Sequence, residues 1–276
     1  MKGNSSETYI FDGKGVLALI GGFIVAILVV ALFNAFSLLV FKINYQYENF
    51  YQFFITAAGF LGSILAFDYF ICRPSIGRKL NFNMSASNFG TYLLIFPMMF
   101  GMMLIAEFFT AIIPTTGPFF GEFYQYFLKL MAEMTTDKAT LILFVVIVAP
   151  VLEEIIFRGI IMKGLINKGF NPTKAIIISA VIFGIVHQNP WQFVGAGLLG
   201  CVLGLVYYKT KSLLLAILLH AFNNLLSAIF LLSGHTESLS ETFQVSEFLI
   251  LGAGIIIFGI FYYLFMKKYQ VHPSEK

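Results

Sequence analysis

Long apolar runs separated by short polar stretches dominate the pattern of this 276-residue chain. Most runs reach the roughly 20 residues that a helix needs to cross about 30 Å of hydrocarbon. Strands of a membrane barrel would instead alternate over about ten residues. The pattern therefore predicts an all-α fold, a polytopic membrane helical bundle of about eight transmembrane helices. The runs cover approximately residues 16–41, 53–72, 91–113, 141–166, 175–189, 191–209, 212–232 and 248–266.

Two stretches depart from simple spanning runs. The run at 175–189 is short and ends at the sequence HQNP, where the Asn-Pro pair stops the helix before Trp191 opens the next. The runs on either side of this break should form a tight helical hairpin. Segment 118–134 mixes aromatic residues with charges, which is typical of an amphipathic helix that lies along the membrane interface.

The runs organise the chain into three parts. Residues 1–139 contain three spans and the candidate interfacial helix, residues 140–232 contain the next four runs, and residues 233–276 contain the last span and a polar tail. The polar stretch before the first run is long for the start of a signal peptide, and no small-residue cleavage site follows it. The first run is therefore predicted to be a retained span.

Composition supports a membrane protein and excludes some partners. The chain is 59% hydrophobic and 11% charged, against about 25% charged residues in ordinary soluble domains. The net charge of +3 is too small to indicate nucleic-acid binding. The two cysteines, Cys72 and Cys201, lie in or beside apolar runs without a Cys-x-x-Cys motif, and we expect two buried thiols.

Lysine and arginine residues outside the spans predict the orientation. One side has the N-terminus, the loops after the second, fourth and sixth runs, and the C-terminus; it carries thirteen basic residues, against three on the other side. Because the cytoplasmic loops of membrane proteins carry an excess of lysine and arginine, we predict a multi-pass cell-membrane protein with both termini cytoplasmic. The thirteen are Lys2, Lys14, Arg73, Arg78, Lys79, Lys163, Lys168, Lys174, Lys209, Lys211, Lys267, Lys268 and Lys276; the three are Lys42, Lys129 and Lys138.

Three charges interrupt the fourth run, in the sequence APVLEEIIFRG. One charge at the centre of a bilayer costs roughly 3 kcal/mol or more. Glu154 and Arg158 are four residues apart, share a helix face and can form an ion pair that locks the span in place. Glu153 points about 100° away, so this pair does not account for it. Ionisable groups inside membranes are functional candidates by default.

Further polar residues interrupt the fifth and seventh runs. His187 ends the sequence FGIVH, while His220 and Asn224 lie one helical turn apart in LLHAFNN. A lone buried histidine is usually a hydrogen-bonded core residue, but two in apolar helices are harder to explain that way. With a rise of 1.5 Å per residue, Glu153, His187 and Asn224 lie about 18–19 Å from the cytoplasmic ends of their spans, and His220 about 12 Å. We therefore expect these groups at similar depths.

A carboxylate, two imidazoles and an amide can hydrolyse a peptide bond. The carboxylate can act as general base for water, and an imidazole and an amide can donate to an oxyanion. The same glutamate and histidines could instead bind a divalent metal such as zinc, with Glu153, His187 and His220 as ligands. The sequence lacks the His-Glu-x-x-His motif of the usual zinc proteases, and no motif marks a Ser or Cys nucleophile. A protease with two catalytic aspartates is also not expected, because only Asp68 of the three aspartates lies in a span.

Three motifs resemble those of a known family. Glu-Glu-x-x-x-Arg at 153–158, Phe-x-x-x-His at 183–187 and His-x-x-x-Asn at 220–224 occur in this order within about 70 residues. Together they resemble the CPBP family of intramembrane proteases, also called the Abi or CAAX prenyl protease 2 / lysostaphin-resistance-A-like family. The resemblance covers roughly residues 140–232, which would form the catalytic core.

The resemblance implies roles for these residues. Glu153 would activate water with His187 as its helper, and His220 and Asn224 would stabilise the oxyanion. Glu154 and Arg158 fill the remaining motif positions, and Arg158 would position the substrate or the helix. The resemblance leaves open whether a metal or the glutamate alone activates the water.

The resemblance also implies partners, and other functions stay open beside it. Members of this family process CAAX proteins, or in bacteria take part in maturing bacteriocins or peptide pheromones and in self-immunity. The richness in Phe, Ile, Lys and Asn fits a bacterial source. The expected partners are a membrane-associated peptide and the lipid bilayer. The alternatives are a non-catalytic scaffold or self-immunity protein of the same fold, and a small transporter with a proton relay, although no repeated half is evident.

Overall fold

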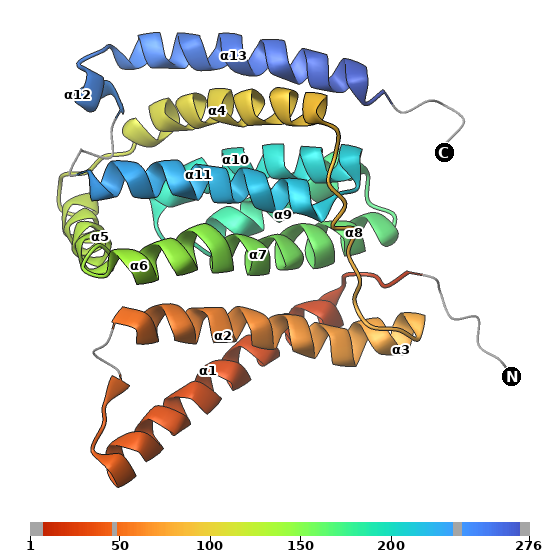
Figure 1. The fold of residues 1–276 in the computed structure, drawn as a ribbon, viewed down its shortest axis with the longest axis vertical. Coiled ribbons are helices and arrows are strands. Elements are labelled where there is room, and N and C mark those ends of the chain that lie inside the picture. Colours follow the sequence, from red (N-terminus) through yellow and green to blue (C-terminus); the bar gives the residue numbers. More distant parts are fainter. Residues whose placement is uncertain (1–7, 46–48, 234–238, 271–276) are drawn as a thin grey trace, which may run out of the picture. The chain divides into compact units, whose positions relative to one another are not determined.

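The computed structural model describes residues 8–45, 49–233 and 239–270, which contain helices joined by turns and loops and no strand (Figure 1). This confirms the all-α class. Lys2, Lys276 and His235, the last a histidine of the loop after the seventh run, lie outside the described residues. The helices are α1 (Gly13–Phe41), α2 (Asn49–Phe67), η2 (Asp68–Cys72), α3 (Arg73–Ile76), α4 (Phe89–Ala111), α5 (Phe120–Met134), α6 (Lys138–Leu141), η3 (Ile142–Val148), α7 (Ala149–Glu154), η4 (Ile155–Met162), α8 (Lys163–Asn167), α9 (Pro172–Ile185), α10 (Pro190–Thr210), α11 (Leu213–Leu232), α12 (Leu239–Phe243) and α13 (Glu247–Lys268).

Seven helical stretches of the described chain are long and apolar enough to cross a membrane. They match seven of the eight expected runs. The remaining run, the fifth at 175–189, forms only the 14-residue helix α9. This helix is about 21 Å long and is short of the roughly 20 residues that a span requires. The helix ends at Ile185 because Gln188 takes a left-handed backbone conformation (φ 60°) and Asn189 caps the following helix.

The chain forms two compact units, each made of two stretches of sequence. The first unit contains residues 1–82 and 132–175, and the second contains residues 83–131 and 176–276. Neither cysteine forms a disulfide; Cys72 is buried and Cys201 is half-buried. The predicted interfacial segment forms α5, which is not among the helices of spanning length.

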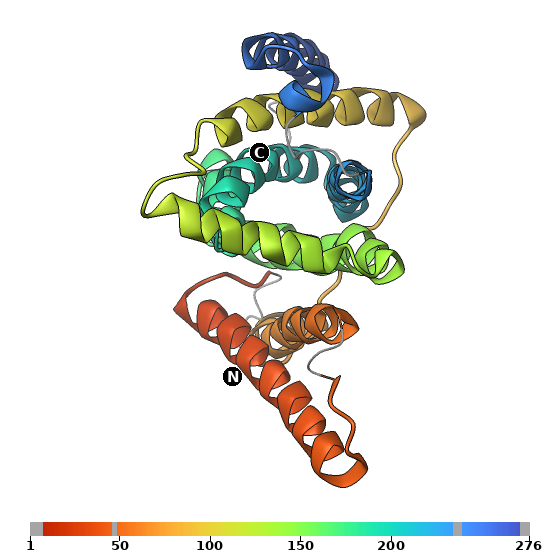
Figure 2. The same ribbon diagram turned by 90° about the vertical axis from the view of Figure 1, so that its left-hand side faces the viewer.

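In the first unit, α1 crosses α2 at an angle (Figure 2), and glycines let the two backbones come close. A Cβ atom added to Gly22 would lie 2.4 Å from the carbonyl oxygen of Gly62. One helical turn away, the Ser63 hydroxyl donates to the carbonyl of Leu19 over 2.8 Å. Small residues at helix crossings are typical of membrane proteins, where close packing replaces the hydrophobic effect.

The second unit has its core between α4, α10, α11 and α13, and α13 lies along α4 (Figure 1). Its fully buried side chains include Ile95, Met98, Leu219 and Phe265. His220 directly follows Leu219 on α11, so this core fixes the helix that carries one of the candidate residues.

Candidate active site

The glutamates lie in one continuous helical stretch from residue 138 to residue 167 whose turns widen twice. In the segments η3 and η4 the backbone follows the wider π-helical pattern, for example from the Ala149 amide to the Phe144 carbonyl and from the Lys163 amide to the Arg158 carbonyl. Pro150 follows the first segment and has no amide hydrogen to donate, so a regular ladder cannot form there. Glu153 and Glu154 end the α-helical turn between the two wide segments, and such π-turns often occur at functional sites.

Glu154 and Arg158 form the ion pair that their spacing predicts. The Arg158 Nη1 atom donates to Glu154 Oε1 over 2.7 Å, and both side chains are completely buried. Glu153, the neighbouring residue, is partly exposed. The two adjacent carboxylates therefore differ in access, because only Glu153 has part of its surface open to water or a ligand.

In the second unit, the ring of Phe183 contacts both candidate histidines edge-to-face. Its centroid lies 5.0 Å from that of His187 and 5.4 Å from that of His220. Phe183 and His220 are buried, whereas His187 is half-buried. The first residue of Phe-x-x-x-His thus packs against the imidazoles of two motifs, which sequence spacing alone did not reveal.

The backbone sets the tautomer of His187. Its Nδ1 atom lies 2.8 Å from the Phe183 carbonyl oxygen, and because a carbonyl can only accept, Nδ1 is the donor. In the neutral imidazole the Nε2 atom then carries the lone pair. His187 can therefore accept a proton or a hydrogen bond, or bind a metal, through Nε2.

Asn189 holds the turn that carries His187 and was not among the predicted site residues. Its Oδ1 atom accepts from the Gln192 amide at 2.8 Å and caps α10, while its Nδ2 atom donates to the His187 carbonyl at 3.0 Å and to Gln192 Oε1 at 2.5 Å. The Asn-Pro signal in the sequence predicted the helix break but not these bonds. Asn189 therefore ties the His187 backbone to the start of the next helix.

Asn224 and Asn223 interact side by side on α11. The Asn223 amide donates to Asn224 Oδ1 over 3.0 Å. Because the Oδ1 atom of Asn224 accepts this bond, the bond fixes the direction in which the Asn224 NH₂ group points. His220 and Asn224 are four residues apart on the same helix and share a face, so both can donate hydrogen bonds in one direction.

An aromatic cluster anchors α5 beside the His187 turn. Trp191, in the first turn of α10, is buried and lies 5.6 Å from Phe123, 4.9 Å from Tyr124 and 5.9 Å from Phe127, measured between ring centroids. Aromatic packing thus fixes helix α5 against Trp191, which follows His187 by four residues in the sequence.

The donor types suit zinc, since one carboxylate and two imidazoles are ligands that zinc accepts. Glu153 belongs to the first unit and the two histidines to the second. Within the described part of either unit, no three His, Cys, Asp or Glu side chains gather in a metal-binding arrangement. A metal held by Glu153, His187 and His220 stays a prediction.

The seven apolar helices of spanning length among the described residues define a multi-pass helical membrane protein, and its motif residues are candidates for hydrolytic chemistry. Residues 135–226 match the family of type II CAAX prenyl endopeptidase Rce1-like proteins, and all six candidate residues lie in that segment. The resemblance drawn from the three motifs is confirmed over this segment.

Two curated relatives match part of the chain. The chain is 41% identical over 78 residues to the putative membrane peptidase YdiL of Bacillus subtilis (strain 168), covering 28% of this chain and 32% of the relative. It is 33% identical over 114 residues to the membrane-embedded CAAX protease MroQ of Staphylococcus aureus (strain USA300), covering 39% of this chain and 45% of the relative. The matches span less than half the length of either relative. No solved structure matches the chain significantly.

Proposed function

We propose that this protein is an intramembrane endopeptidase that hydrolyses a peptide bond of a membrane-associated peptide. The observation that carries the proposal is the intact set of three motifs inside the Rce1-like segment. The partly exposed Glu153 beside the buried Glu154–Arg158 pair supports it, as does the Nδ1–H tautomer of His187. The proposed substrates are CAAX-type proteins or precursors of bacteriocins or peptide pheromones.

In the proposed reaction, Glu153 removes a proton from a water molecule whose second hydrogen is held by His187 Nε2. The oxygen attacks the scissile carbonyl, and the developing oxyanion accepts hydrogen bonds from His220 and the Asn224 NH₂ group. The proton on Glu153 then passes to the leaving nitrogen as the carbon–nitrogen bond breaks. Glu154 and Arg158, with their charges mutually neutralised, hold the helix of Glu153.

Cleavage by the purified protein tests the proposal directly. The full chain in lipid nanodiscs would be incubated with a prenylated CAAX peptide, its unprenylated twin and a hydrophobic precursor peptide, and the products analysed by mass spectrometry. We expect cleavage of at least one peptide. Failure on all three substrate types, with correctly folded protein, would favour the scaffold or self-immunity alternative.

The same assay separates the two ways of activating water. If Glu153 acts without a metal, a strong chelator leaves the cleavage rate unchanged. If Glu153, His187 and His220 hold zinc, the chelator abolishes cleavage and added zinc restores it.

We predict that Asn189 is a positioning residue for His187. Asn189→Ala removes the cap of α10, which should cost about 1 kcal/mol of stability, and also removes the tie to the His187 carbonyl. Asn189→Asp keeps the cap oxygen but loses the donor. We therefore expect Asn189→Asp to restore the melting temperature and leave kcat low. Recovery of both together would assign Asn189 to stability alone.

A further inference from the structure

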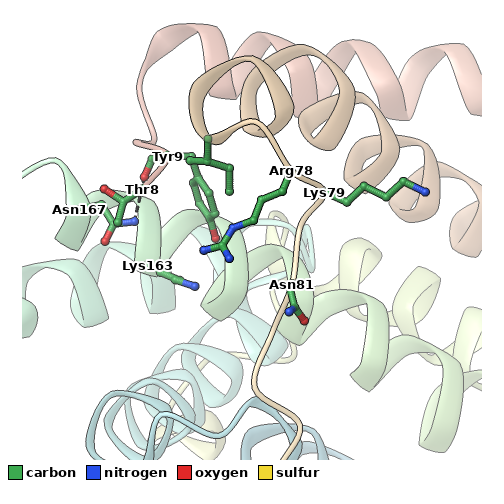
Figure 3. A pocket seen from close by; sticks show the side chains of 8 residues that line it. Thr8, Tyr9, Arg78, Lys79, Asn81, Lys163 and Asn167 are labelled. Carbon is green, nitrogen blue, oxygen red and sulfur yellow. Dashed lines mark hydrogen bonds between the residues drawn. The ribbon is translucent and has the colours of Figure 1, made fainter. Parts of the chain in front are cut away.

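A polar cavity of about 120 Å³ lies in the first unit, where three segments far apart in the sequence meet (Figure 3). The segment before α1 contributes Tyr9, the turn after α3 contributes Arg78 and Lys79, and the final turns of the long helix contribute Lys163 and Asn167. Its volume has room for about four water molecules or for one phosphate group. None of its lining residues belongs to the candidate active site.

Two cations converge on this cavity. Figure 3 shows Arg78 and Lys163 extended into the space beside the Tyr9 ring, whereas Lys79 points away. The Lys163 Nζ atom lies 5.8 Å from the centre of that ring. Among the described residues, no carboxylate lies within ion-pair distance of Arg78 or Lys163. Because like charges repel, an anion bound between them would relieve an unfavourable interaction.

The wall formed by the N-terminal segment is fixed by the chain itself. Tyr9 is buried and its hydroxyl donates to the Gly159 carbonyl. The Asn167 amide donates to the Tyr9 carbonyl over 2.8 Å, and the Phe11 amide donates to the Gly164 carbonyl over 3.1 Å. This side of the cavity is therefore preformed, as is common for ligand sites.

The opposite wall is held by a buried aspartate. Asp68 accepts from Arg73 at 2.6 and 2.8 Å and from the Leu80 amide at 2.7 Å. These bonds close the turn that ends at Gly77, whose positive φ of 72° suits glycine. Arg78 directly follows this turn, so the ion pair of Asp68 positions the base of the Arg78 side chain.

The location of the cavity indicates what kind of anion it meets. Its residues lie at the ends of the spanning stretches that finish at Ile76 and Asn167, on the side that the basic residues predict to be cytoplasmic. Span ends lie at the level of the lipid headgroups. Tyr69 and Phe70, near the end of the span that precedes Arg78, are 62% and 66% exposed, as expected for aromatic residues at a membrane interface.

We propose that this cavity binds the phosphate of an anionic phospholipid of the cytoplasmic leaflet. Arg78 offers a planar pair of donors that matches two phosphate oxygens, and Lys163 adds a point charge. Basic pockets between spanning helices on the cytoplasmic side bind such headgroups in other membrane proteins. The bound lipid joins the segment before α1 and the turn after α3 to the helix that carries Glu153.

Native mass spectrometry of the full chain in detergent tests this site. Phosphatidylglycerol, which is anionic, would be titrated against phosphatidylcholine, which has a phosphate but no net charge. We expect preferential binding of phosphatidylglycerol. The double variant Arg78→Gln/Lys163→Gln should lose about 25-fold in affinity, at about fivefold for each cation. The matched control Lys168→Gln, an exposed lysine just past α8 that does not line the cavity, should bind normally.

Any one of four results would overturn the proposal. Equal binding of the two lipids, or an equal loss in Lys168→Gln, would indicate a general surface effect. A charge-conserving variant, Arg78→Lys/Lys163→Arg, should stay within about threefold of the parent; a loss as large as in the neutral variant would indicate disturbed packing. Inorganic phosphate that displaces the lipid at equal concentration would assign the cavity to free phosphate instead. These readouts do not depend on peptide cleavage.

Discussion

Glu153→Gln should reduce peptide cleavage by at least about a hundredfold. A positioned general base contributes roughly 10²–10⁴ to a hydrolytic rate, and the amide of glutamine cannot take a proton from water. The substitution keeps the shape of the side chain, so the partly exposed position should tolerate it and the melting temperature should change little. The measurement is kcat for the best peptide found with the parent protein.

A matched control separates the loss of a base from the loss of a charge. Glu122 is exposed on α5 and lies outside the three motifs. Glu122→Gln removes one carboxylate and should leave kcat unchanged. Cleavage by Glu153→Gln within about twofold of the parent would rule out Glu153 as the base, while leaving open a protease with another base.

The second large effect is on stability. Arg158→Met should destabilise the folded protein by about 3–5 kcal/mol, because it leaves the completely buried carboxylate of Glu154 without its ion-pair partner. For a chain of this size we expect the melting temperature in detergent to fall by about 10 °C. Thermal unfolding followed by circular dichroism would measure the change.

Another intrahelical arginine provides the comparison. Arg73 pairs with Asp68 over 2.6 Å, but its side chain is 41% exposed. Arg73→Met should therefore cost only about 1 kcal/mol. Adding Glu154→Gln to Arg158→Met should recover much of the loss, since no buried charge remains. Equal losses in Arg158→Met and Arg73→Met would show that burial of the pair does not determine its contribution.

Hydrophobic periodicity and helical spacing predicted much of this architecture. The lengths of the apolar runs predicted about eight spanning helices, and seven helices of the described chain have spanning length. The spacing of Glu154 and Arg158 predicted their ion pair. Both follow from local geometry, namely rise per residue and residues per turn. The family resemblance also followed from local motifs, and the match over residues 135–226 confirms it.

Features that depend on distant contacts were not predictable in this way. Pro150 indicated an interruption, but the two wide segments around Glu153 depend on how the whole stretch packs. Phe183 contacts His220 across 37 positions of sequence, and no periodicity encodes such a contact. The end of α9 at Ile185 depends on the capping bonds of Asn189 as well as on Pro190.

The local character of the Glu154–Arg158 pair also has a consequence for biogenesis. A glutamate and an arginine that enter the bilayer centre separately cost about 2.5–3.5 kcal/mol each during insertion through the translocon. Since the partners are one turn apart on the same helix, they can neutralise each other as soon as that turn forms. The span can therefore leave the translocon before its neighbours are synthesised, which a pair divided between two helices would not allow.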